Sequence, residues 1–550
     1  MRLTSLAHYQ RDTKRFAQIV AVLARHGLAQ RLDRLEPDFL KRWLGHEDLS
    51  ELADLPLGDR IRRACEELGP AFIKVGQVLS TRPDVIPPDI AQSLEALQAG
   101  TPPSPQEEIE AIIEEELGAP CRELFLNWNA EPLASASIGQ VHRAQLPDGT
   151  HVVVKVQHPG IVQKIETDLA ILMHLARFLE EHDPEMALYA PVVLAQETKR
   201  TLLRELDFRR ELRNQQAFER NFAGNESVRI PATYPDFSGS RVLTMEYLPG
   251  FPVSDRDRIL REGLDPGDVA LTGARAFLDM VFRDRLFHAD PHPGNVLLLP
   301  DGSVGLLDFG MVGRLDEDTL DDLVDLLIGF VRSDADTITR AVLRLGSVPG
   351  DCDETALRRE LTELQEELAG TPFGQLDAAQ MLGQFTALIR THHITLPGPL
   401  SLLIKVLVML DGTSRSLDRD FNLVEILRPY CERAIKRRHS PRAQMQRIWD
   451  AGRDWTRLLE RLPGTLDDFS RRFLSHAPSV DLQHKGLEVT VERLVSGILC
   501  AAMLLGGSIM WALKAPPTIL GISVLGFVAT AVALLHGIRL LSQLGKRPPH

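Results

Sequence analysis

Three polar side chains near the middle of the chain have the types and spacing that phosphoryl chemistry requires. Asp290 and Asn295 lie five residues apart in FHADPHPGN (287–295), where two prolines exclude a helix. Asp308 follows thirteen residues after Asn295, in LLDFG. Carboxylate and amide oxygens are the hard ligands that Mg²⁺ prefers, so Asn295 and Asp308 are candidate metal ligands. Asp290 is the candidate catalytic residue, because it could orient an attacking oxygen or accept its proton.

Zinc is the rival interpretation of the same loop. His288 and His292 lie four residues apart, which on a helix would place both rings on one face. Pro291 and Pro293 make the segment a loop, and the sequence offers no third ligand. The two histidines are therefore expected to brace the loop.

A lysine upstream completes a pattern that resembles protein kinases. Lys155 lies in VVVKV, a β-branched run after a PDG turn, and it is expected to grip the phosphates of ATP. The carboxylate that usually pairs with such a lysine would be Glu205 or Glu211, and spacing does not decide between them. The segment MEYL resembles a kinase hinge, whose backbone would hold adenine through Glu246, Tyr247 and Leu248.

Three departures from ordinary kinases are informative. No GxGxxG loop covers the phosphates, HAD stands in place of HRD, and no APE follows the DFG segment. The segment LASASIGQVHRA occupies the position of the glycine-rich loop, and its small side chains let the backbone approach a nucleotide less freely than glycine would. The nucleotide-contacting residues expected in this loop are Ala134, Ser135, Ala136 and Ser137.

These departures resemble the UbiB/ABC1/ADCK family of atypical kinase-like proteins over roughly residues 60 to 430. The matching segments include FIKVGQVLSTRPDVIP, which holds the family's KxGQ motif, and ELDF, which holds its ExD motif. The resemblance implies that Lys74 and Gln77 reach into the active site and pair with the ExD carboxylates of Glu205 and Asp207. Apolar spacing alone would make the KxGQ segment a simple packing helix. Most members of the family carry alanine where this chain has Gly139.

The resemblance also implies a fold and an activity. The fold would be α+β: a bilobal protein-kinase-like fold with a helical N-terminal extension and a C-terminal transmembrane helical hairpin. The activity would be an ATPase that binds ATP and Mg²⁺ and supports ubiquinone biosynthesis at the bacterial inner membrane, with the kinase-like domain in the cytoplasm. Expected partners are a quinone-precursor lipid and other ubiquinone-biosynthesis proteins, and a homodimer is left open. Two alternatives remain, a small-molecule phosphotransferase and a nucleotide-switched lipid-binding scaffold.

Changes of pattern along the chain predict five segments. They are a helical extension at 1–125, a kinase-like N-lobe at 126–250, a C-lobe at 251–430, a basic amphipathic linker at 431–490 and two membrane helices within 494–538.

Within these segments, apolar periodicity predicts a helix over 60–83, and Ser104 is a candidate N-cap before Pro105. A long helical stretch is expected from about 160 to 222.

Two apolar runs near the C-terminus predict membrane spans. Leu494–Leu513 holds twenty residues without a charge, and a second run covers Thr518–Ile538. Both reach the length that a bilayer core requires. Gly506 and Gly526 are among the small residues that could let two helices approach closely. The alternative is a pair of buried core helices.

Composition narrows the function further. The 550-residue chain has a net charge of −14, which argues against nucleic-acid binding. Its five cysteines are scattered without a CxxC pair, which indicates a reducing compartment. The Arg-rich stretch 431–475 carries Trp449 and Trp455. This stretch either rests on anionic lipid headgroups or is a solvated helical linker.

Overall fold

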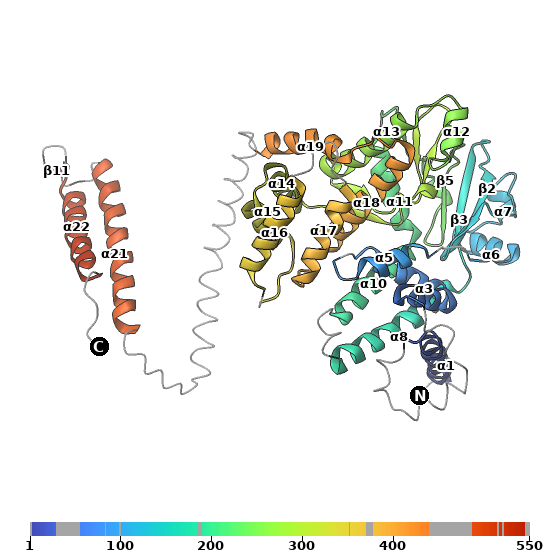
Figure 1. Cartoon of the computed structure of the whole chain (residues 1–550), viewed down its shortest axis with the longest axis horizontal. Coiled ribbons are helices and arrows are strands. Elements are labelled where there is room, and N and C mark those ends of the chain that lie inside the picture. Colours follow the sequence, from blue (N-terminus) through green and yellow to red (C-terminus); the bar gives the residue numbers. More distant parts are fainter. Residues whose placement is uncertain are drawn as a thin grey trace. The chain divides into compact units, whose positions relative to one another are not determined.

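A computed structural model describes most of the chain (Figure 1). The described residues are 3–28, 55–82, 84–97, 101–183, 190–350, 352–369, 378–438, 487–513, 516, 518–519 and 522–544. The chain divides into two compact units, Met1–Met445 and Gln446–His550. Most of the predicted basic linker, including Trp449 and Trp455, lies outside the described residues.

Helices build the N-terminal extension. They are α1 (Leu3–Arg25), α3 (Leu57–Leu68), α4 (Pro70–Ser80) and α5 (Pro88–Glu95). The single helix expected over 60–83 is instead two, because Gly69 adopts φ 92° and ψ −161°, a conformation that only glycine adopts readily. Apolar side chains of α3, α4 and α5 share one core with Ile138, Leu243 and Met245 of the following lobe.

A four-stranded antiparallel sheet forms the N-lobe. Its strand order is β1 (Ala134–Ser135), β2 (Gly139–Gln145), β3 (His151–Gln157) and β5 (Val242–Glu246). Val152, Val154 and Val156 of β3 are buried against α6 (Gln106–Leu117) and α7 (Cys121–Leu124). The period of two therefore places Lys155 on the opposite face of this strand.

The predicted N-cap of α6 is wrong. Pro105 occupies the N-cap position and makes no side-chain capping bond. The hydroxyl of Ser104 instead lies 2.8 Å from Nδ1 of His158, just after β3.

The helical stretch expected from about 160 to 222 is confirmed for the residues that the structure describes there, and it is divided into separate helices. They are α8 (Ile161–His182), α10 (Pro191–Glu205) and α11 (Phe208–Asn221). Asp207 caps α11, because its carboxylate accepts a hydrogen bond from the backbone N–H of Arg209. This cap fixes the start of the helix that carries Glu211.

The C-lobe is mainly helical around short strands. Its described elements are β4 (Val228–Arg229), β6 (Phe251–Pro252), α12 (Arg256–Arg261), α13 (Pro266–Asp279), η3 (Met280–Asp284), β7 (Leu286–His288), η4 (Pro293–Asn295), β8 (Val296–Leu298), β9 (Val304–Leu306), β10 (Val312–Arg314), α14 (Glu317–Arg332), α15 (Ala335–Leu345), α16 (Glu354–Ala369), α17 (Ala378–Thr391), α18 (Gly398–Leu417) and α19 (Leu423–Arg438). The short helix η2 (Pro235–Phe237) packs on the N-lobe instead, because Phe237 lies against the core of β3. Strands β8 and β9 form a hairpin between Asn295 and Asp308, and this hairpin brings the two residues to the same end. The predicted mixture of helix and sheet is confirmed.

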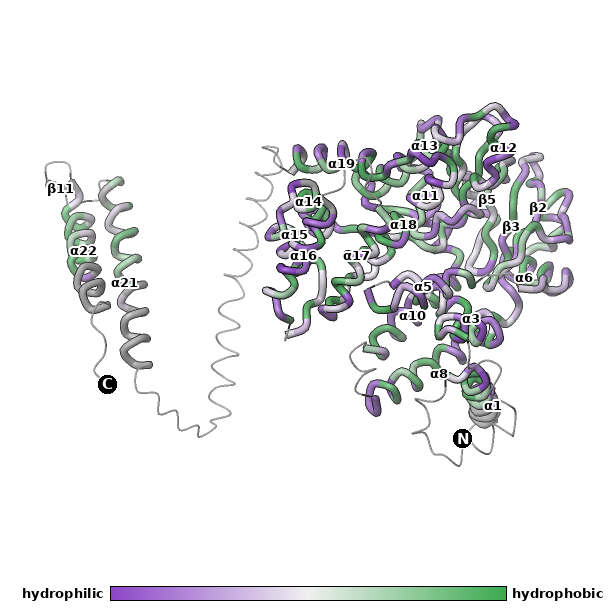
Figure 2. Tube along the Cα trace, in the orientation of Figure 1, coloured by the Kyte–Doolittle hydropathy of each residue, from purple (hydrophilic) through white to green (hydrophobic). Residues whose placement is uncertain are grey.

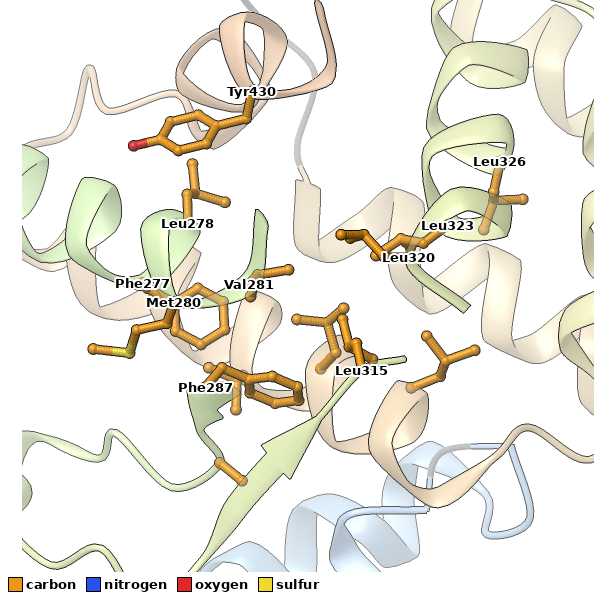
Figure 3. Packing of buried hydrophobic residues seen from close by; sticks show 14 of the residues in the cluster. Phe277, Leu278, Met280, Val281, Phe287, Leu315, Leu320, Leu323, Leu326 and Tyr430 are labelled. Carbon is orange, nitrogen blue, oxygen red and sulfur yellow. The ribbon is translucent and has the colours of Figure 1, made fainter. Parts of the chain in front are cut away.

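The C-lobe core lies directly behind the polar loop at 287–295. Phe277 and Phe287 meet edge to face, with their ring centroids 6.0 Å apart. Leucines of α14 and Tyr430 of α19 belong to the same cluster (Figure 3). Dense packing of this kind restricts the backbone that leads into the loop.

The described part of the C-terminal unit holds the helices α21 (Leu487–Ala512) and α22 (Val524–Leu544), with the short paired strands β11 (Thr518–Ile519) and β12 (Ile522–Ser523) between them in sequence. Figure 2 shows mostly hydrophobic residues in the described part of α22. The helices approach closely at Gly507, where a Cβ would lie 3.0 Å from the carbonyl oxygen of Gly526.

The predicted transmembrane hairpin is not supported by this unit. Within the part of the chain that the structure describes, no helix is both long enough and apolar enough to cross a membrane. Parts of both predicted spans, Leu494–Leu513 and Thr518–Ile538, lie outside the residues whose side chains are described. The close helix contact includes the predicted Gly526, but its partner is Gly507 rather than the predicted Gly506, where an added Cβ would have nothing within 4 Å.

Candidate active site

Lys155 is the centre of the first group of charges. Its ammonium nitrogen lies 2.9 Å from Oε2 of Glu211 and 3.4 Å from Oδ2 of Asp308. Only 15% of the Lys155 side chain and 5% of the Glu211 side chain are exposed. The structure therefore pairs Lys155 with Glu211 and joins the pair to Asp308.

Glu205, the other candidate partner, belongs to a second ion pair. Its Oε2 lies 2.9 Å from the ammonium of Lys74, on helix α4. Asp207 of the ExD motif turns away from this pair and binds Arg209. Gln77 also turns away, because its amide donates to the backbone carbonyl of Leu97. The expectation that Gln77 pairs with the ExD carboxylates is therefore wrong, and so is the expectation for Asp207.

The loop that carries Asp290 is held by histidine. Nε2 of His288 donates to the carbonyl of Leu307, 2.9 Å away, so its Nδ1 is free to accept a hydrogen bond from the backbone N–H of Asp290. His292 accepts a bond from the N–H of Gly294 in the same way. Asn295 closes the loop, since its Nδ2 donates to the backbone carbonyl of Asp290. Both histidines thus brace the loop, as expected.

The backbone of Asp308 is unusual. Its φ of 56° lies in the left-handed region, and its Oδ1 accepts a hydrogen bond from the N–H of Gly310. The next residue, Phe309, is fully buried between Phe218 of α11 and the ring of His288. Asn214 of α11 donates to the carbonyl of Phe309. The helix of Glu211, the Asp290 loop and Asp308 are therefore packed together.

Electrostatics follow from this packing. Desolvation opposes ionisation of Asp308, but the ammonium groups of Lys155 and Lys74 outweigh it and hold the pKa of Asp308 well below its usual range. Since 47% of the Asp308 side chain is exposed, solvent screens part of this effect. Burial raises the pKa of Glu211 to about 7, against the opposing effect of Lys155. Burial also lowers the pKa of His288, which favours the neutral ring.

The donor set fits Mg²⁺ bound together with a phosphate ligand. Within the described residues no group of three or more His, Cys, Asp or Glu side chains could hold a metal alone. Mg²⁺ is usually held by one or two carboxylates together with substrate phosphates and water. One carboxylate, from Asp308, and one amide oxygen, from Asn295, meet that requirement.

The expected nucleotide loop is partly a strand. Ala134 and Ser135 form β1, paired with Val141 and Gln140 of β2. The turn that follows is held by the N–H of Ala136, which donates to the carbonyl of Gly139. Ser137 is buried.

Gly139 lies at the start of β2, close against the backbone of β3. A Cβ there would lie 2.4 Å from the carbonyl oxygen of Val156, so this backbone has no room for a side chain.

The expected hinge uses most of its polar groups within the protein. The N–H of Glu246 donates to the carbonyl of Ala232, and the N–H of Tyr247 donates to that of His151. The carboxylate of Glu246 binds Arg229, 2.6 Å away. Leu248 is buried. These contacts place the hinge at the end of β5, and adenine contacts there stay a prediction.

Comparison with known proteins identifies the family. The model of the ABC1 atypical kinase-like domain matches residues 96–342, the UbiB helical domain matches 361–422, and the ABC1/UbiB kinase-like C-terminal domain matches 480–545. A probable protein kinase UbiB from Aliivibrio fischeri is 32% identical over 504 residues, which cover 89% of this chain and 91% of that protein. The chain belongs to the UbiB/ABC1 family.

Other known proteins are also similar to this chain. A probable protein kinase UbiB from Azotobacter vinelandii is 34% identical, over 87% of each chain. The uncharacterized protein sll1770 from Synechocystis is 35% identical over 67% of this chain, which spans 63% of that relative. A solved complex of Rv3197 with erythromycin, from Mycobacterium tuberculosis, is 25% identical over 64% of this chain, with a TM-score of 0.44.

Two contacts in this UbiB/ABC1 chain were not foreseen from the sequence. His158 holds the nucleotide loop, because its Nε2 lies 2.9 Å from the carbonyl of Ala136 and its backbone N–H donates to Ile138. Asn214 links α11 to the DFG segment. The spacing of Asn214, three residues after Glu211 and so on the same helical face, was the available signal. A histidine directly after a strand carries no comparable signal.

Proposed function

We propose that this chain is an ATP-dependent, kinase-like enzyme that binds Mg-ATP between its two lobes. The observation that carries the proposal is the Lys155–Glu211 ion pair with Asp308 beside it. An ammonium next to a carboxylate in this arrangement is what phosphate binding in kinases requires.

The roles of the side chains follow from their positions. Lys155 would hold the nucleotide phosphates, with Glu211 fixing its ammonium. Asp308 and Asn295 would hold Mg²⁺, which supplies charge neutralisation on the phosphate oxygens. Asp290 would orient the attacking oxygen, since His288 and Asn295 hold its backbone at the N–H and at the carbonyl. Ser135 belongs to the expected nucleotide loop. Its buried hydroxyl has no hydrogen-bond partner in the described part of the chain, so it would offer a polar group to the nucleotide.

The position of Lys74 limits which molecule could accept the phosphoryl group. Its charge interacts with Asp308 and Asp290 as well as with Glu205, so a basic group of the extension lies near the position where an acceptor would bind. This favours hydrolysis, or transfer to a small molecule, over transfer to a peptide. The small-molecule phosphotransferase is therefore the second candidate.

The biological setting is proposed from the relatives. Those named UbiB match most of this chain, and on this basis we place the activity in support of ubiquinone biosynthesis at the bacterial inner membrane. The C-terminal unit exposes large apolar side chains, among them Leu505, Leu513 and Leu535. Exposed apolar patches of this kind mark interaction surfaces, so we assign this unit to contact with membrane lipid or a quinone-precursor lipid.

Calorimetry with the full chain tests the activity. We expect the wild type to bind Mg-ATP and to hydrolyse it slowly, with release of ADP. We expect Asp308→Asn to lose ATP binding in the presence of Mg²⁺. Asp318→Asn, at an exposed position in the first turn of α14, is the matched control and should behave as the wild type. Quinone-lipid profiles of cells that carry each variant test the setting. Full quinone synthesis with Asp308→Asn would favour the lipid-binding scaffold, and stoichiometric phosphorylation of a metabolite would favour the phosphotransferase.

A further inference from the structure

A buried carboxylate lies immediately after helix α4, the helix that carries Lys74. Asp84 has no exposed side-chain surface. Its two oxygens accept hydrogen bonds from Nε and Nη2 of Arg82, at 3.0 and 2.9 Å. This two-point geometry is the strongest arrangement between a guanidinium and a carboxylate.

The same carboxylate also accepts hydrogen bonds from the C-lobe, more than 300 residues further along the chain. The backbone N–H of Leu396 donates to Oδ2 at 3.1 Å, and the hydroxyl of Ser401 donates to Oδ1 at 3.1 Å. Leu396 precedes α18, and Ser401 lies in its first turn and is fully buried. Asp84 therefore has four donors, two from the extension and two from the C-lobe.

Helix α4 is attached to the N-lobe as well. Lys74 forms its ion pair with Glu205 at the end of α10, and Phe72 and Val75 lie in the core that contains Leu243 of the N-lobe sheet. Arg82 additionally binds Glu197, which is also on α10. One short helix thus has its apolar face on one lobe and its C-terminal end bound to the other.

We propose that Asp84 is a positioning residue that clamps α4 between the lobes, holding Lys74 over the active site and limiting how far the lobes separate. A separation of the lobes would remove Leu396 and Ser401 from a buried charge, and the loss of donors from a buried carboxylate is costly. The expected effect of the clamp on ATP rests on the proposed function. The expected restriction of lobe separation does not, because it concerns the nucleotide-free protein.

Two variants of the full chain address the clamp. Asp84→Asn removes the charge and replaces one carboxylate oxygen with an NH₂ group, which at either position meets an N–H of Arg82 donor to donor. Ser401→Ala removes one of the bonds between the lobes and leaves the Arg82–Asp84 pair in place, so it is the variant that keeps the fold. Asp89→Asn, at an exposed position in the first turn of α5, is the matched control.

Hydrogen exchange in the nucleotide-free protein gives the first measurement. We expect amides of α4 and of residues 394–401 to exchange about tenfold faster in Ser401→Ala and in Asp84→Asn, with the rest of the chain unchanged. The second measurement is ATP hydrolysis. The KM for ATP should rise about threefold in Ser401→Ala, with kcat within about twofold of the wild type, because only preorganisation of the site is lost.

Three results would overturn the clamp: unchanged exchange in both variants, faster exchange spread over the whole chain, or an equal effect of Asp89→Asn. If the wild type neither binds nor hydrolyses ATP, the proposed function fails, and the exchange measurement still decides whether the clamp exists.

Discussion

The ammonium of Lys155 and the carboxylate of Glu211 form a 2.9 Å ion pair, although 56 residues separate them along the chain. The pair is carried by strand β3 and helix α11, and the described residues between these two elements include helices α8 and α10. The start of α11 is nevertheless fixed beside β3, because Asp207 caps the helix and Phe208 packs in the N-lobe core. The geometry of the site thus depends on where α11 begins rather than on the length of chain before it.

The raised pKa of Glu211 predicts a pH dependence of stability. The pKa of a glutamate is 4.5 in the unfolded chain, and burial raises the pKa of Glu211 to about 7 in the folded chain. Between these values the folded state keeps a proton that the unfolded state has lost, so the free energy of unfolding falls as the pH rises from about 4.5 to about 7. Glu211→Gln removes this contribution. We expect its stability, relative to the wild type, to rise by about 3 kcal/mol across that window.

Denaturant unfolding at a series of pH values measures this difference. Glu226→Gln, at an exposed position outside the site, is the control and should follow the wild-type curve. Parallel curves for Glu211→Gln and the wild type between pH 4.5 and 7 would show that Glu211 does not titrate in that range.

The Lys74–Glu205 pair predicts strong coupling between its two members. Both side chains are largely buried, so Lys74→Met leaves a carboxylate without its cation, and Glu205→Met leaves the ammonium without its anion. Each single change should cost about 3 kcal/mol of stability, and the double variant should recover most of that loss. A double-mutant cycle by chemical denaturation measures the coupling. Additive losses would mean that the two side chains are stabilised by other neighbours.

Much of the site could be predicted from the sequence, because catalytic motifs hold their residues in short segments. The spacing of Asp290, Asn295 and Asp308 placed all three in one region, and the β8–β9 hairpin that joins them is short. The choice between Glu205 and Glu211 could not be made, since it depends on where α10 ends and α11 begins. That boundary is set by the cap at Asp207, which looked like part of the ExD motif.

The errors in the fold have local physical causes. Periodicity continued across Gly69, and only its positive φ shows that α3 and α4 are separate helices. Ser104 had the sequence of an N-cap, but His158, 54 residues later, provided a competing partner. Gln77 belongs to the KxGQ motif, but its amide donates to the carbonyl of Leu97. In each case a tertiary contact or a backbone angle outweighed the local pattern.

His158 predicts an effect on nucleotide affinity. Its ring and its backbone N–H hold the carbonyls of Ala136 and Ile138, so it fixes the turn after β1. His158→Leu keeps a side chain of substantial size but removes the bond to Ala136, and the KM for ATP should rise about fivefold with little change in kcat. Ser104→Ala removes only the group on the other side of the ring and should have a smaller effect. An unchanged KM in His158→Leu would show that the turn is held by its backbone alone.

Gly69 predicts a stability effect that also reaches the active site. At φ 92° and ψ −161°, an alanine is strained even though a Cβ there meets nothing closer than Nζ of Lys164, 3.6 Å away. Gly69→Ala should therefore lower the free energy of unfolding by about 1–3 kcal/mol through the backbone alone. Gly273→Ala, in the interior of α13 with open space around it, is the matched control and should raise stability by about 1 kcal/mol.

Thermal and denaturant unfolding of the two variants measure these opposite signs. Gly69 sets the direction in which α4 leaves α3, and Lys74 follows it by five residues. Gly69→Ala should therefore also loosen the Lys74–Glu205 pair. The expected sign is faster hydrogen exchange in α4, together with a smaller coupling energy when the Lys74 and Glu205 changes are repeated in the Gly69→Ala background. If Gly69→Ala and Gly273→Ala shift stability in the same direction, the break between α3 and α4 does not depend on the conformation of Gly69.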